Sequence, residues 1–162
     1  MEECNIDFLR KAYRVLEKKY KLPEFDLLNR DFQIEKIADS ETEYLLREIR
    51  KMISAVLTNY LRFVEIVLHP VNVPMFIFSI VKSLGKDELS RFKEIYKKLA
   101  RKEIELIRLD LTYDEKGEVD FIKDSCKIWQ GVKKDILDVI KTIEKNWDNK
   151  IELNGKGNNY FG

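Results

Sequence analysis

Along most of the chain, apolar residues recur every three or four positions, which is the spacing of amphipathic helices. The first such segment predicts a helix over residues 6–21, with Asn5 as its N-cap and Pro23 just beyond its end. Its apolar face is formed by Leu9, Ala12, Tyr13, Leu16 and Tyr20. Residues 22–39 have no clear period, so we expect an irregular segment or a short turn. The apolar residues of this segment should pack it against the rest of the domain.

A second helix is predicted to run from a capping box at Ser40 and Glu43 to about residue 68, before Pro70. Its first half is amphipathic, with Glu48, Arg50 and Lys51 on the polar face. Its second half is apolar on almost every side. That pattern is typical of the central helix of a bundle.

The stretch 69–85, HPVNVPMFIFSIVKSLG, is the most apolar part of the chain. Pro74 suits a first helical turn and Gly85 suits the C′ position, so residues 74–84 are expected to form a short helix. Eleven residues span only about 16 Å, roughly half of a bilayer core, which excludes a transmembrane helix here. Two alternatives remain: burial under the flanking helices, or a surface that pairs with another chain. The interface residues would be Met75, Phe76, Ile77, Phe78, Ile80, Val81 and Leu84.

The C-terminal half predicts two further helices, with one ambiguous region between them. Acidic residues in the first turn favour a helix that starts at Lys86. Apolar and polar residues then alternate over 107–121, which fits either a helix–turn–helix at 114–117 or a small β-hairpin. We favour helices, because strong helix formers precede this region and a long helix over 118–147 follows it. Residues Ile122, Trp129, Ile136 and Ile143 of that helix lie seven apart, as in a bundle seam.

Taken together, these segments predict a mainly α, single-domain helical bundle of four to five helices. Residues 1–149 would form the bundle and residues 150–162 a flexible C-terminal tail. With 162 residues, 44% hydrophobic and 36% charged, the chain can bury a core of its own. The high content of Lys and Glu resembles that of thermophile proteins.

Charge and composition exclude several classes of function. Thirty basic and 29 acidic residues give a net charge of +1, which implies neither a nucleic-acid partner nor a strongly acidic substrate. The N-terminus, MEECNIDF, has no apolar signal region, so we expect a cytoplasmic protein that makes no membrane contact. Cys4, Cys126 and a single histidine cannot assemble a zinc site. The two cysteines are expected to be reduced thiols, with one disulfide as the alternative.

One polar line on the predicted central helix is a candidate for chemistry. Thr58, Arg62, Glu65 and His69 follow i, i+4, i+7 and i+11, which places them on one face. Glu65 and His69 could form an acid–base pair at a pocket, or the line could simply be where the helix meets solvent. The acidic residues Glu103, Glu105 and Asp110 are interleaved with Lys and Arg, which favours a solvated face over a metal site.

The first predicted helix carries a basic cluster that includes tyrosines, a combination that suits phosphate and stacking contacts. Its basic residues are Arg10, Lys11, Arg14, Lys18 and Lys21.

No catalytic, phosphate-binding or cofactor motif is present in the sequence. We therefore expect no cofactor and no metal, and an enzyme is the less favoured class. The leading hypothesis is a small cytosolic interaction module that forms a homodimer or joins a larger assembly. The alternative is an accessory nucleic-acid-binding protein, and the third hypothesis is an enzyme with a pocket at Arg62, Glu65 and His69.

Overall fold

The computed structural model describes residues 2–40 and 42–155, and the side chains of residues 5–40 and 42–146. Over this part of the chain it contains six α-helices and one 3-10 helix, and no strand. The elements are α1 (Glu2–Tyr20), α2 (Phe25–Phe32), η1 (Ile34–Asp39), α3 (Leu45–Leu68), α4 (Met75–Ser83), α5 (Lys86–Thr112) and α6 (Glu115–Gly155). The predicted mainly α, single-domain bundle is confirmed, and no β-hairpin forms at 107–121.

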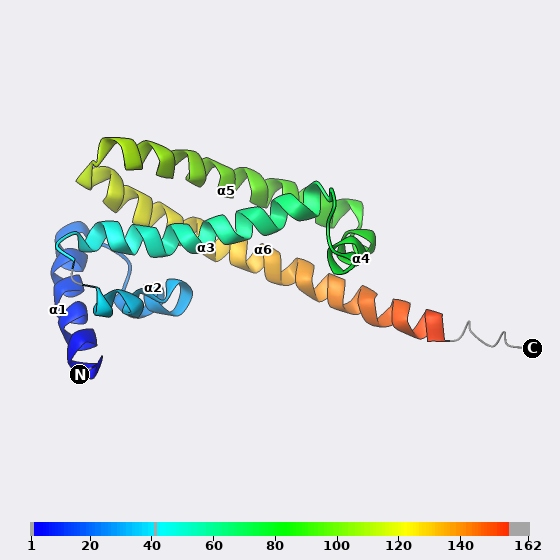
Figure 1. The fold of residues 1–162 in the computed structure, drawn as a ribbon, viewed down its shortest axis with the longest axis horizontal. Coiled ribbons are helices and arrows are strands. Elements are labelled where there is room, and N and C mark those ends of the chain that lie inside the picture. The colour runs from blue at the N-terminus through cyan, green and yellow to red at the C-terminus, as the bar shows by residue number, and fades with distance from the viewer. Residues whose placement is uncertain (1, 41, 156–162) are drawn as a thin grey trace, which may run out of the picture.

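Three long helices, α3, α5 and α6, make up the body of the bundle. Figure 1 shows α1, α2 and η1 gathered at one end of these helices and α4 at the other end. In the same view α6 continues past α4 and leaves the bundle. None of the helices in the described residues is long and apolar enough to cross a membrane.

The core forms where the apolar stripes of the three long helices meet. Buried residues include Ile49, Ile53 and Leu57 of α3 and Phe92, Ile95 and Leu99 of α5. The predicted seam of α6 is confirmed as far as Val139, and its buried residues are Ile122, Ser125, Cys126, Trp129, Val132, Ile136 and Val139. Beyond this point the seam is weaker, because Ile143 is only half-buried and Ile140 is 37% exposed. Burying each large apolar side chain stabilises the fold by about 1.5–3 kcal/mol, so this seam holds α6 in place.

The N-terminal third differs from the prediction at three points. Helix α1 begins at Glu2, so Asn5 lies inside the helix instead of capping it. The segment 22–39, predicted to be irregular, forms α2 and η1, and its apolar residues are buried as expected. The capping box is absent, because the Ser40 hydroxyl donates to the carbonyl of Ile37 at 2.7 Å and closes η1. Helix α3 starts later, at Leu45.

The connection between α5 and α6 is a tight turn at Tyr113 and Asp114. Tyr113 adopts the left-handed conformation, with φ of 53°. The Asp114 carboxylate accepts hydrogen bonds from the backbone N–H groups of Lys116 at 3.2 Å and Gly117 at 2.9 Å, which caps α6. A β-carbon at Gly117 would lie 2.5 Å from Cδ2 of Leu109, so any larger residue there would displace the Leu109 side chain.

Helix α6 continues to Gly155 instead of ending near residue 147. The first residues of the predicted tail, 150–155, are therefore helical. Residues 156–162, the rest of that tail, lie outside the described residues, and so does the side chain of Trp147.

Candidate functional site

The polar line predicted on the central helix lies on the outer surface of α3. Arg62, Glu65 and His69 are exposed, and among the described side chains no ion pair joins them. Thr58 donates instead to Oε2 of Glu103 on α5, at 2.8 Å. Thr58 and Arg62 border a cavity of about 370 Å³ between α3 and α5, but Glu65 and His69 do not. The structure therefore does not bring these residues together in one pocket.

The basic residues of α1 fall into two groups. Lys11, Arg14 and Lys18 are exposed and follow i, i+3 and i+7 along one face of α1, whereas Lys21 is exposed but lies just past the end of the helix. Arg10 instead pairs with Asp26 at 2.8 Å. Of the two tyrosines in this segment, Tyr13 is fully buried and cannot stack on a base, which corrects part of the nucleic-acid hypothesis.

The short apolar helix α4 is only partly covered by the bundle. Ile80 is buried, whereas Ile77, Val81 and Leu84 are half-buried. The other three predicted interface residues are exposed, at 77% for Met75, 63% for Phe76 and 40% for Phe78. The end of α4 is tied to α6, because the Asn146 side-chain amide donates to the Ser83 carbonyl at 2.9 Å.

A buried cluster of charges was missed by sequence reasoning. Arg50, which the pattern assigned to the polar face, is only 3% exposed. Its Nη2 lies 2.8 Å from Oδ1 of Asp110 at the end of α5, and its Nε lies 2.6 Å from Oε2 of Glu118 at the start of α6. Glu118 is itself only 5% exposed. The cluster therefore joins all three long helices at one end of the bundle.

The electrostatics of this cluster are dominated by burial. Burial raises the pKa of the Glu118 carboxyl above its usual value, and the positive charges of Arg50 and Arg47 oppose that rise. The contact of Arg50 Nε with Glu118 is an ion pair and not a well-aligned hydrogen bond. Oε1 of Glu118 has no hydrogen-bond partner among the described residues. One buried acceptor thus remains unpaired, which is costly in a protein interior.

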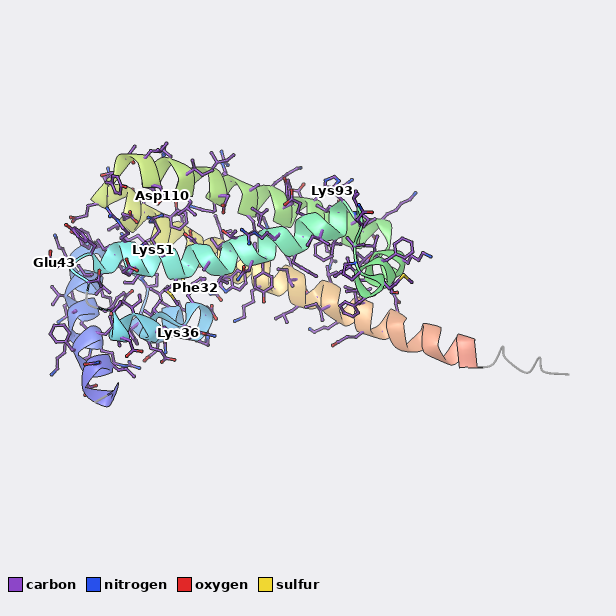
Figure 2. All side chains as sticks on the ribbon, viewed as in Figure 1. Phe32, Lys36, Glu43, Lys51, Lys93 and Asp110 are labelled. Carbon is purple, nitrogen blue, oxygen red and sulfur yellow. The ribbon has the colours of Figure 1, made fainter. Side chains whose placement is uncertain are left out.

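A cavity of about 360 Å³ lies beside Glu118, between α1, the start of α3 and the α5–α6 turn. Three tyrosines from these segments line it, Tyr20, Tyr44 and Tyr113. The guanidinium of Arg47 also lines it and lies 4.5 Å from the ring centroid of Tyr113 and 5.3 Å from that of Tyr44. Figure 2 shows Glu43, another lining residue, and Asp110 toward the same end of the bundle.

Several charges around this cavity already have partners. Lys19 lies 3.6 Å from Glu115, and the Tyr20 hydroxyl donates to the same carboxylate. Arg50 neutralises Glu118 as described above. Arg47 makes no ion pair with any described residue, and its Nε is buried without a hydrogen-bond partner. The cavity therefore holds one unpaired donor and one unpaired acceptor.

One signal in the sequence could have revealed Arg50. Leu46, Arg50, Ile53 and Leu57 follow i, i+4, i+7 and i+11, so Arg50 lies on the same stripe as three apolar residues. A charge on such a stripe must find a partner when the helix packs. No comparable signal marks Glu118, whose position in a first helical turn is common for glutamate.

Within the described side chains, no group of three or more His, Cys, Asp or Glu residues is placed to hold a metal ion. Cys126 is buried, and burial raises the pKa of its thiol. The side chain of Cys4 lies outside the described residues, and with it the alternative of a disulfide. Comparison of the chain with protein-family models, with curated proteins and with solved structures finds no match.

Proposed function

We propose that the chain is a self-associating helical module and that α4 is its contact surface. The observation that carries this proposal is the exposure of Met75, Phe76 and Phe78 on one short helix that buries only Ile80 among its apolar residues. Val71, just before α4, is 77% exposed and extends the same apolar region of the chain. Apolar residues that are exposed together favour association, because full burial of each such side chain contributes about 1.5–3 kcal/mol of free energy.

A second copy of the chain is the partner that suits this surface. Helix α4 has one charged residue, Lys82, and its ammonium lies 4.4 Å from the ring centroid of Phe78. Charge repulsion across a two-fold axis is therefore small, and the net charge of +1 per chain adds little. A two-fold interface sets the same patch against itself, so apolar side chains meet apolar side chains. A stable interface buries about 800 Å² per partner, so residues around α4 must form its rim.

The test is the mass in solution, measured by light scattering from low to high micromolar concentration. We expect a dimer for the wild type and folded monomers for Met75→Asp and Phe76→Asp. Val15→Asp is the matched control, because Val15 is equally apolar and exposed but lies on α1, and this variant should remain a dimer. Ile80→Asp should unfold, since Ile80 is buried. A wild type that stays monomeric at several hundred micromolar would refute the proposal.

A second candidate is the binding of a polyanion such as single-stranded nucleic acid along α1. The observation in its favour is the exposed row of Lys11, Arg14 and Lys18, which form no ion pair with described residues. Backbone phosphates bound by such a row release counterions, so affinity must fall steeply with salt. Fluorescence anisotropy with a labelled oligonucleotide at several salt concentrations tests this. Equal affinity for the wild type and for Arg14→Glu with Lys18→Glu contradicts it.

A further inference from the structure

We propose that the cavity between α1, α3 and the α5–α6 turn binds a free α-amino acid with an apolar side chain. Its volume of about 360 Å³ lies in the range of about 300–1,000 Å³ that is usual for small-molecule sites. Such sites combine apolar walls with a few polar groups that fix the orientation of the ligand. This proposal is independent of association through α4, which lies at the other end of the bundle.

The carboxylate of the ligand would be held at the start of α3. Arg47 is the only residue of the cavity lining whose cation makes no ion pair with a described carboxylate. The rings of Tyr44 and Tyr113 lie against its guanidinium and keep it beside the cavity. Leu45, Leu46 and Arg47 form the first turn of α3, where backbone N–H groups point out of the helix and favour an anion. The N-cap residue Tyr44 does not satisfy these groups with its side chain.

The ammonium group would be held by Glu118, with Glu43 at the rim of the cavity. Glu118 is more than nine-tenths buried, and its Oε1 has no hydrogen-bond partner among the described residues. A donor that carries a positive charge satisfies this oxygen. Arg47 and Glu118 line the same cavity, so one small molecule can contact both.

The side chain of the ligand would lie against Leu16 and the ring of Tyr20, which form the α1 wall. Nε of Arg47 and both carboxylate oxygens of Glu118 are shielded from solvent, so the ligand reaches them when the side chain of Arg47 rotates. The exposed rings of Tyr44 and Tyr113 allow this rotation, because they lie at the rim and not in the core. A zwitterion with an apolar side chain is the class that matches every part of the lining.

Three probes that share a phenylethyl group separate the contribution of the carboxylate from that of the ammonium. They are L-phenylalanine, 2-phenylethylamine, which lacks the carboxylate, and 3-phenylpropanoate, which lacks the ammonium. Calorimetric titration of the full chain at pH 7 should show that phenylalanine binds at least about tenfold more tightly than either analogue. That factor is the loss expected when one charge-assisted hydrogen bond is not made.

Variants assign each charge to its residue. Arg47→Met should remove the advantage of phenylalanine over phenylethylamine, and Glu118→Gln should remove its advantage over phenylpropanoate. Asp110→Asn is the matched control, since Asp110 also pairs with Arg50 but does not line the cavity. It should leave all three affinities unchanged.

Leu16→Trp fills the cavity without a change of charge and should abolish binding of all three probes. This variant still tests the proposal if Glu118→Gln fails to fold. The proposal is overturned if phenylalanine binds no better than its analogues, or if Leu16→Trp folds and binds it as the wild type does. It is also overturned if no probe binds, in which case a bridging water satisfies Arg47 and Glu118.

Discussion

Replacement of Arg50 by methionine tests the buried charge cluster most directly. Methionine keeps most of the side-chain volume but removes the guanidinium that pairs with Glu118 at 2.6 Å and with Asp110 at 2.8 Å. Glu118 would then be a buried carboxylate without a counter-ion. Loss of one partner from a buried ion pair costs about 3–5 kcal/mol, and at about 2–4 °C per kcal/mol the melting temperature should fall by roughly 6–20 °C.

The companion variants should show a clear asymmetry. Glu118→Gln leaves Arg50 paired with the exposed carboxylate of Asp110, so we expect a smaller loss, about 1–3 kcal/mol. Arg50→Met combined with Glu118→Met replaces both charges with apolar groups, and its stability should lie close to or above that of the wild type. Urea unfolding followed by circular dichroism at pH 7 measures all three. Single losses that simply add in the double variant would refute the reasoning, because removal of the second charge must relieve the first loss.

The pH dependence of Arg50→Met follows from the direction of the Glu118 shift. Burial raises the pKa of this carboxyl in the folded state, and Arg50 opposes the rise. A carboxyl with a raised folded pKa stabilises the fold most at pH below its unfolded pKa, about 4.3, and this contribution is lost as pH rises through the folded pKa. Without Arg50 the folded pKa rises further, so the loss in Arg50→Met should shrink as the pH is lowered from 7. Arg62→Met, on the exposed face of the same helix, should stay within about 0.5 kcal/mol of the wild type at every pH.

Three other substitutions test the core, the polar line and the attachment of α2. Ile53→Ala removes a fully buried side chain of α3 and should cost about 2–5 kcal/mol in urea unfolding. His69→Gln changes an exposed residue and should alter stability by less than about 0.5 kcal/mol. Burial of Asp31 acts to raise its pKa, but hydrogen bonds from Lys133 and Gln130 outweigh this and hold the pKa below its usual value. The Asp31 carboxylate therefore stabilises the fold above its unfolded pKa, and this stabilisation is lost as the pH falls through the folded pKa. Asp31→Asn should reduce stability at pH 7 and have less effect in acid.

The long helices could be predicted because the information that specifies them is local. In α6, residues such as Ile122, Trp129 and Ile136 repeat over many turns, and every turn strengthens the same inference. The elements α2 and η1 span eight and six residues, too few for a period to stand out. Their burial could be foreseen from their apolar residues, but their helical form could not.

The charge cluster and the cavity could not be predicted because their parts are distant in sequence. Arg50 and Glu118 are on different helices, and although the apolar stripe of α3 marks Arg50, nothing in the sequence indicates that Glu118 is its buried partner. Spacing alone placed Thr58, Arg62, Glu65 and His69 on one face of α3, and in the structure the last three are exposed. A shared face is a local property, whereas a pocket requires other elements to pack beside it.

The length of α6 has a consequence for how the molecule moves in solution. Its 41 residues extend about 60 Å, whereas a compact chain of 162 residues has a radius of gyration of about 15 Å and therefore a diameter of about 40 Å. A globule with such a rod leaving one end experiences more friction than a sphere of equal mass. The chain should therefore elute early from a sizing column, and a monomer would be mistaken there for a dimer. Its frictional ratio from sedimentation velocity should exceed that of a compact protein even when only one chain is present.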